Sequence, residues 1–255
     1  MAQEREVQVH LLPCLALPGQ LTGCLAVVID VLRATTTIIH ALAAGCTAVR
    51  PCSEVEEAKQ LAGTMRAGRV LLAGERGGVP LPGFDLGNSP REFTARNCRH
   101  ATLVLTTTNG TRALLRAAEA ERAIVAGFVN YSAVCEQLRS DARPIHIVCA
   151  GTDEAVTLED ALLAGALVDF LSETMEVHLN DGARLAWDCF ENHGRVLLGA
   201  LEISQGGENL KRLGYDDDIR DAAKVDLFNL VPELKRDPLR VEVGAVGVMK
   251  KYWRN

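Results

Sequence analysis

The chain has 255 residues, 48% of them hydrophobic, which is enough for one substantial core. Its formal net charge is −6 and it has no run of five like charges, which argues against nucleic acid or an anionic membrane surface as a partner. The eight cysteines include no Cys-x-x-Cys pair, and a chain of this size does not depend on disulfides, so free thiols are expected.

Short apolar strands alternate with helical patterns through the first 150 residues. The expected strands are residues 7–12, 25–30, 48–51, 70–73, 103–106, 123–126 and 145–149. The expected helices between them are residues 36–44, 54–66, 111–120 and 132–139. This alternation is typical of βαβ units, so we predict an α/β fold with a mostly parallel sheet and flanking helices.

The pattern changes after Thr157, where two long helices are expected over residues 158–175 and 183–203. A strand signal returns only at residues 239–243. We therefore expect a single domain with an α/β core over about residues 1–155 and a helix-rich C-terminal layer over about residues 156–255. This layer could cover one face of the sheet or form a lid. The first nine residues carry charges of both signs rather than an apolar leader, which indicates a cytosolic protein.

Polar residues gather where predicted strands end, which is where open α/β sheets bind ligands. The strand over residues 25–30 ends in Asp30, followed by Arg33 and Thr35. Asp30 suits a metal ligand or a nucleophile, and the planar guanidinium of Arg33 suits a phosphate. The alternative is that Asp30 or Thr35 caps the next helix and that Arg33 pairs with Asp30.

A second strand runs into Gly74-Glu75-Arg76-Gly77-Gly78, again a carboxylate beside an arginine. Flanking glycines allow the backbone to approach a ligand closely. One such pair is ordinary, but two pairs at strand ends indicate a combined metal and phosphate site.

A third strand ends in Thr106-Thr107-Thr108-Asn109-Gly110-Thr111 and leads directly into a helix. Backbone N–H groups of such a turn can form an anion nest at the helix N-terminus. The alternative is a purely structural turn at Asn109-Gly110 with Thr111 as helix cap.

Other candidates are weaker. Glu159 and Asp160 follow a later strand and add carboxylates at the same sheet edge, although Thr157 with Asp160 could be only a helix cap. Cys149 lacks an arginine six positions later, so we expect it to serve in packing. No Walker A, Gly-x-Gly-x-x-Gly or His-Glu-x-x-His signature is present.

Taken in order, these blocks resemble the 2-phosphosulfolactate phosphatase family. The matching blocks are residues 30–37 (DVLRATTT), 74–78 (GERGG), 84–90 (FDLGNSP), 106–111 (TTTNGT), 127–130 (GFVN), 149–152 (CAGT) and 157–161 (TLEDA), with weaker matches at 222–226 and 231–232. Each block is weak alone, but the seven blocks in this order are a specific signal that spans nearly the whole chain.

The resemblance implies an α/β, magnesium-dependent hydrolase that converts 2-phospho-3-sulfolactate and water to 3-sulfolactate and phosphate, a step in coenzyme M biosynthesis. We infer that Mg²⁺ would be held by Asp30, Glu75 and Asp85. Arg33 and Arg76 would stabilise phosphoryl charge, and water would attack with Glu159 or Asp160 as base, unless Asp30 is a covalent nucleophile. Substrate contacts are expected from Thr35, Asn88, Thr106, Thr107, Thr108, Asn109, Gly110 and Thr111.

Two alternatives remain at this stage. A non-catalytic sensor of a phosphorylated or sulfonated acid could use the same arginines, although carboxylates beside arginines would not help an anion binder without a metal. A phosphatase acting on another small phosphoester is equally compatible with the motifs. The expected partner is a small-molecule phosphate ester, with no nucleic acid or membrane, and a homodimer is a base-rate expectation.

Overall fold

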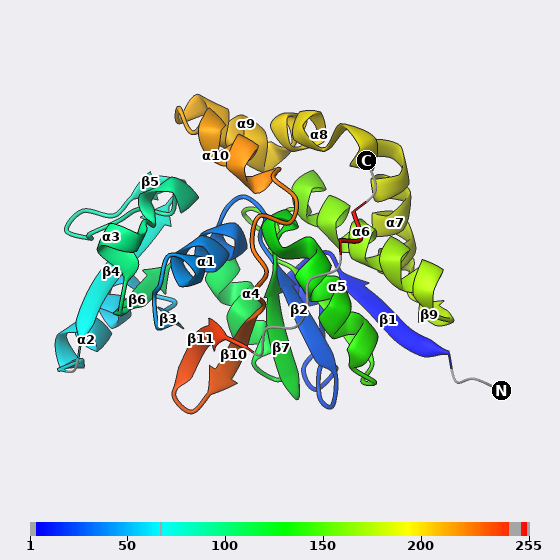
Figure 1. Ribbon diagram of the computed structural model, residues 1–255, viewed down its shortest axis with the longest axis horizontal. Coiled ribbons are helices and arrows are strands. Elements are labelled where there is room, and N and C mark those ends of the chain that lie inside the picture. Colours follow the sequence, from blue (N-terminus) through cyan, green and yellow to red (C-terminus); the bar gives the residue numbers. More distant parts are fainter. Residues whose placement is uncertain (1–3, 67, 245–250, 254–255) are drawn as a thin grey trace.

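The computed structural model describes residues 4–66, 68–244 and 251–253, and in them eleven strands form one sheet with helices packed around it (Figure 1). The strands are β1 (Arg5–His10), β2 (Leu25–Ile29), β3 (Ala48–Pro51), β4 (Arg69–Arg76), β5 (Val79–Pro80), β6 (Ala101–Thr106), β7 (Arg122–Ala126), β8 (Ile145–Cys149), β9 (Val177–Leu179), β10 (Pro232–Arg236) and β11 (Leu239–Val243). The α-helices are α1 (Ala34–Ala43), α2 (Val55–Thr64), α3 (Ala95–Cys98), α4 (Gly110–Ala117), α5 (Tyr131–Ser140), α6 (Leu158–Thr174), α7 (Asp181–His193), α8 (Leu197–Ile203), α9 (Gln205–Arg212) and α10 (Asp216–Ala222).

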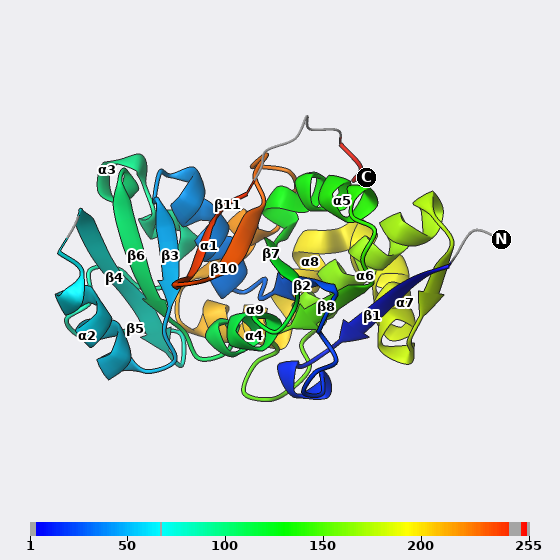
Figure 2. The ribbon, with the colours of Figure 1, turned by 90° about the horizontal axis from the view of Figure 1, so that it is seen from below.

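The sheet order is β5-β4-β6-β3-β11-β10-β7-β2-β8-β1-β9. Strands β4, β6 and β3 form one parallel group, and β7, β2, β8, β1 and β9 form another. The antiparallel hairpin β10–β11 lies between the two groups and pairs with β7 on one side and β3 on the other (Figure 2). The predicted α/β fold with a mostly parallel sheet is confirmed. Strands β5, β9 and β10 were not expected from the sequence.

Buried strands carry apolar side chains on both faces, as a sheet covered on two sides requires. Val27 packs in a core formed with α5 and α6, whereas its neighbour Val28 points to the opposite face, toward α1 and α4. The eight cysteines are free thiols, as expected. Cys149 is buried in the first core, and burial raises the pKa of its thiol, so its packing role is confirmed.

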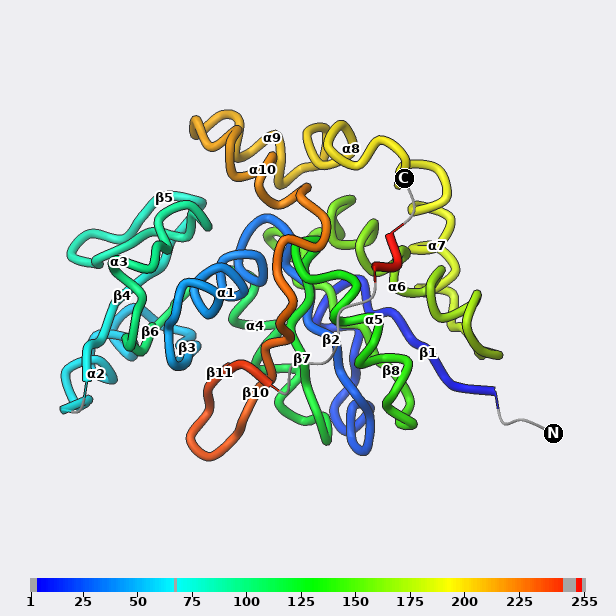
Figure 3. Tube along the Cα trace, viewed as in Figure 1, coloured from blue at the N-terminus to red at the C-terminus, as the bar shows by residue number. Residues whose placement is uncertain are grey.

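The C-terminal half is rich in helices, as predicted, but the long helix expected over residues 183–203 is wrong. Helix α7 ends at His193, and a 3-10 turn (Gly194–Val196) separates it from α8. A side chain at Gly194 would lie 2.5 Å from the Phe190 ring, so the chain turns here with the glycine backbone against that ring. Beyond α8, the chain continues through α9 and α10 above the sheet in the view of Figure 3. None of the helices in the described ranges is long and apolar enough to cross a membrane.

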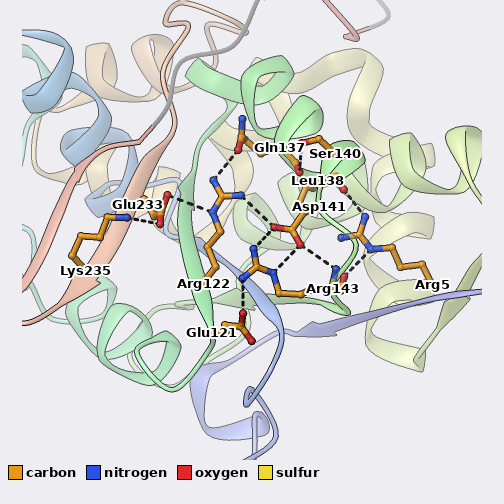
Figure 4. Close-up of polar contacts among 10 residues, drawn as sticks. All are labelled: Arg5, Glu121, Arg122, Gln137, Leu138, Ser140, Asp141, Arg143, Glu233 and Lys235. Carbon is orange, nitrogen blue, oxygen red and sulfur yellow. Dashed lines mark hydrogen bonds and ion pairs between the residues drawn. The ribbon is translucent and has the colours of Figure 1, made fainter.

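A polar network ties together the amino ends of β7, β8 and β1 (Figure 4). The Asp141 carboxylate accepts hydrogen bonds from Arg143 Nη2 at 2.6 Å and from Arg122 Nη1 at 3.3 Å. Arg5 Nε donates to the Arg143 carbonyl at 2.8 Å. Burial opposes ionisation of Asp141, but these arginine hydrogen bonds outweigh it and lower its pKa to about 2. The network therefore stabilises the amino ends of these three strands, opposite the strand ends that carry the polar motifs.

We expect the Asp141→Asn protein to be less stable than wild type at pH 7 by about 1 kcal/mol, after allowance for solvent screening around Arg143. Because the folded-state pKa is depressed, this stability is fully present above the unfolded value near pH 4. It is lost as pH falls through about 2. Urea unfolding between pH 7 and pH 3 should show the difference narrowing only at the acid end. A difference independent of pH would contradict the assignment.

Candidate active site

A pocket of about 370 Å³ lies at the carboxyl ends of β2, β4 and β6, beneath α9. The predicted site residues that line it are Asp30, Arg33, Glu75, Asn88, Thr107, Thr108 and Asn109. Four chain segments, from both parallel groups of the sheet, therefore meet at one place. The remaining lining comes from Leu32, Gly77, Gly78, Thr152, Asp153, Gly206, Asn209, Leu210, Arg212 and Leu213.

Asp30 follows β2 and is 7% exposed. One carboxylate oxygen, Oδ1, accepts a hydrogen bond from the Ala34 N–H at 3.0 Å, so Asp30 caps α1 while its Oδ2 is free of hydrogen bonds from the described residues. Burial raises the pKa of this carboxyl to about 7, and the nearby charges of Glu75 and Glu159 act in the same direction. Asp30 therefore has both a helix-capping role and an oxygen available to a ligand.

Glu75 is the penultimate residue of β4 and links two loops beside the pocket. Its Oε1 accepts from the Thr108 N–H at 2.8 Å and from the Thr108 hydroxyl at 3.1 Å. Its Oε2 accepts from the Gly78 N–H at 2.7 Å. These bonds fix the Glu75 carboxylate facing the same space as Asp30.

Arg33 is almost fully buried and is held by the C-terminal layer. Its Nη1 donates to Asp218 Oδ2 at 2.7 Å, its Nη2 donates to the Gly78 carbonyl at 2.9 Å, and its guanidinium lies 4.4 Å from the centre of the Tyr215 ring. Asp218 also accepts from the Ser89 hydroxyl at 2.6 Å. The alternative pairing of Arg33 with Asp30 is therefore not the one formed. The Arg33 side chain still lines the pocket, and Asp218 balances its charge.

The threonine turn after β6 satisfies much of its own hydrogen bonding. The Thr107 N–H donates to the Thr111 hydroxyl, and the Thr111 N–H donates to the Thr107 hydroxyl, both at 3.2 Å. With Thr108 N–H bonded to Glu75, the Asn109 and Gly110 N–H groups are the ones in this turn without an acceptor among the described residues. The anion nest expected here is therefore reduced to two amides.

Gly110 begins α4 in direct contact with Asp30. A Cβ at this position would lie 2.4 Å from the Ala34 Cβ and 2.6 Å from Asp30 Oδ2. The absence of a side chain thus lets the turn approach the carboxylate.

We expect Gly110→Ala to destabilise the protein by about 1–3 kcal/mol through overpacking, and to lower activity by displacing Asp30. Gly63 in α2 is a matched control because a Cβ there meets nothing within 4 Å. Gly63→Ala should be neutral or stabilising by up to about 1 kcal/mol. Thermal unfolding and activity of the two variants check this, and equal behaviour would refute the role given to Gly110.

Glu159 and Asp160 lie at the start of α6 behind Asp30, and both are buried. Asp160 Oδ1 accepts from the Val31 N–H at 2.9 Å and its Oδ2 accepts from the Gly151 N–H at 3.0 Å. Glu159 Oε2 has no hydrogen-bond partner within the described chain. Burial raises the pKa of both carboxyls. Asp160 is thus engaged in holding two loops, whereas Glu159 keeps a free oxygen.

Several predicted site residues are not brought to the pocket. Asp85 is exposed and accepts from the Leu72 N–H at 2.8 Å, and Arg76 donates to the Ser53 carbonyl and the Thr106 hydroxyl, both at 2.9 Å. The Thr35 hydroxyl donates to the Asp30 carbonyl at 2.8 Å. Thr106 and Thr111 are likewise buried in structural bonds, whereas Asn88 reaches the pocket with its Oδ1 unpaired.

The donor set fits magnesium only in part. Within residues 4–66, 68–244 and 251–253, no three His, Cys, Asp or Glu side chains are grouped to hold a metal. Asp30 and Glu75 nevertheless face one pocket, and Mg²⁺ in enzymes commonly uses one or two carboxylates with water and substrate phosphate. These two residues fit such a site, whereas Asp85 lies outside it.

The sequence prediction missed the contribution of α9 and α10. Asn209 and Arg212 line the pocket from α9, and Asp218 and Tyr215 hold Arg33 from α10 and its N-cap. Asp218 is 1% exposed, which is unusual for an aspartate and is the strongest structural sign of its role. In the sequence it is one of three consecutive aspartates, a run that resembles a solvated surface.

Comparison with known proteins agrees with the motif blocks. A model of the 2-phosphosulpholactate phosphatase family matches residues 12–237. The chain is 42% identical over 227 residues to the probable 2-phosphosulfolactate phosphatase of Thermotoga petrophila, covering 89% of this chain and 92% of the relative. It is 41% identical over 214 residues to that of Symbiobacterium thermophilum, covering 84% and 92%. The matched region contains every residue that lines the pocket.

Proposed function

The chain belongs to the 2-phosphosulfolactate phosphatase family, and on that basis we propose that it hydrolyses the phosphate monoester of a small acidic hydroxy acid. The proposed substrate is 2-phospho-3-sulfolactate, which gives 3-sulfolactate and phosphate, as in coenzyme M biosynthesis. One observation supports this most strongly. Asp30 and Glu75 line the same pocket as Arg33 and Asn109, whose N–H has no acceptor among the described residues, and this places groups suited to a cation next to groups suited to a phosphate.

In this proposal the phosphoryl group lies in the pocket beside Asp30, Glu75 and Asn109. The Asn109 N–H group and the Arg33 guanidinium donate to its oxygens, where charge must be stabilised during transfer. Asn88 Oδ1, which has no hydrogen-bond partner among the described residues, accepts from a water molecule in the pocket. Water attacks phosphorus as the ester P–O bond breaks, and the leaving alkoxide takes up the proton that the water gives up, so that the hydroxy acid and phosphate are released. Glu159, whose Oε2 has no partner among the described residues, is the group proposed to relay this proton.

Magnesium is part of the proposal. Asp30 and Glu75 would hold the ion, and it would neutralise charge on the phosphoryl oxygens. Glu75 is already oriented by Thr108 and Gly78, so a cation would meet one fixed carboxylate.

Removal of divalent cations with EDTA is expected to lower the rate of phosphate release by about 100-fold or more, and Mg²⁺ should restore it. Mg²⁺ should also raise the melting temperature of wild type, because a ligand that binds only the folded state stabilises it. This second effect should disappear in Glu75→Gln. Full activity in EDTA would contradict the proposed role of Mg²⁺ but would not contradict the proposed hydrolysis.

The function is tested by phosphate release from 2-phospho-3-sulfolactate and a panel of phosphorylated hydroxy acids. The expected result is rapid release from the sulfonated ester with slower release from the others. Tight binding of an ester without release of phosphate would show that the chain is a binding protein rather than an enzyme.

A further inference from the structure

The positive charges at the pocket differ in whether they are neutralised. Arg33 is paired with Asp218 at 2.7 Å, and both side chains are buried. Arg212, at the end of α9, also lines the pocket but forms no ion pair with any described carboxylate. Its hydrogen bonds go to Asn209 Oδ1 and, at 3.4 Å, to the Glu208 carbonyl. Arg212, which is exposed, is therefore the arginine of the pocket lining that has no carboxylate partner among the described residues.

The helix places Arg212 away from Glu159. Gly206, near the start of α9, lies against Glu159, since a Cβ on Gly206 would be 2.1 Å from Glu159 Oε1. Arg212 is six residues later, which is roughly 9 Å farther along the helix. Asn209 is three residues from Arg212 and shares its face of the helix. A ligand held at Asp30 can thus present a second group toward Arg212.

The end of α9 is fixed against the opposite wall of the pocket. The turn after β4 packs on it closely, since a Cβ on Gly78 would lie 2.6 Å from Leu213 Cδ1. The same turn bonds Glu75 and Arg33. Packing of this turn against the end of α9 therefore fixes the distance between Arg212 and the residues proposed to bind the phosphate.

We propose that Arg212 binds the acidic group of the substrate farthest from the phosphate, with Asn209 orienting the guanidinium. Arg212 then determines the preference for phosphoesters that carry a second strong acid, such as a sulfonate. This inference rests on the proposed function and names the part of the substrate that α9 recognises. An arginine that serves only as a solvated surface residue would leave that preference unchanged.

The test compares Arg212→Met with wild type on two esters, 2-phospho-3-sulfolactate and 2-phospholactate, which lacks the sulfonate. We expect kcat/KM for the sulfonated ester to fall by about 30- to 100-fold, mainly through KM, and that for 2-phospholactate by less than about threefold. Arg212→Lys should recover part of the loss. Lys211→Met is the matched control, since Lys211 lies on the same helix and pairs with Glu202 at 3.8 Å outside the pocket.

An equal fall for both esters, or no fall for either, would overturn the inference while the phosphatase function stands. Calorimetry with 3-sulfolactate tests the inference in the case where the proposed phosphatase function fails. If wild type hydrolyses neither ester but binds 3-sulfolactate, and Arg212→Met weakens that binding at least about tenfold, the proposed function fails and the inference holds. Absent binding, or binding that Arg212→Met does not change, would overturn the inference.

Discussion

Replacing Asp30 by Asn is expected to lower the rate of phosphate release by about 10³-fold or more, while the protein stays folded. Asp30 is the buried carboxylate that caps α1 with one oxygen and turns the other toward the pocket. Asparagine keeps an oxygen that can accept from the Ala34 N–H but removes the negative charge that is proposed to hold Mg²⁺ beside the phosphoryl group. The melting temperature should be unchanged or higher, because burial near Glu75 and Glu159 opposes ionisation of Asp30.

Asp85→Asn is the natural control for this variant, because the sequence motifs place both aspartates in one predicted metal set. Asp85 is exposed and accepts from the Leu72 N–H, so its replacement should change activity by less than about threefold. Steady-state rates for the two variants at saturating substrate show which of the two aspartates is needed for activity. A large loss in Asp85→Asn with a small loss in Asp30→Asn would reverse the assignment.

Asp218→Ala is expected to reduce the free energy of unfolding by about 3–5 kcal/mol, because it leaves Arg33 buried without its partner. For a chain of this length, that corresponds to a melting temperature lower by about 10 °C. Ser89 would also lose its acceptor, and α10 would lose its attachment to the strand end that carries Arg33.

Asp217→Ala provides the neighbouring control. Asp217 pairs with Arg91 and Arg220 on the surface, so its loss should cost no more than about 1 kcal/mol. The double variant Arg33→Met/Asp218→Leu should regain most of the stability lost in Asp218→Ala but remain inactive, because the pair is replaced by apolar groups and the pocket loses its arginine. Equal melting temperatures for the Asp217 and Asp218 variants would refute the buried pair.

Eight of the described strands were predictable because their apolar runs are short and bounded by turns. Asp30 and Glu75 were both expected near strand ends, but β2 and β4 belong to separate parallel groups, so only the fold shows that the two ends meet at one pocket. Arg76 was predicted to lie at the site but does not line the pocket. Neighbouring strand residues point to opposite faces, so Glu75 faces the pocket whereas Arg76 reaches Ser53.

The contribution of the C-terminal layer could not be read from the sequence. Asp216, Asp217 and Asp218 are alike as residues, and only the packing of α10 against Arg33 buries the third of them. The threonine turn shows the same limit. Its composition predicts an anion nest, but whether Thr107 and Thr111 bond to each other or to a ligand depends on the fold.

Release of phosphate from a small acidic ester at this pocket is proposed to depend on Asp30. The most direct measurement is the initial rate of phosphate release from 2-phospho-3-sulfolactate, with Mg²⁺, by wild-type and Asp30→Asn proteins prepared in parallel. We expect rapid release by wild type and a rate near background for the variant. Equal rates for the two proteins, or no release by either, would contradict this expectation.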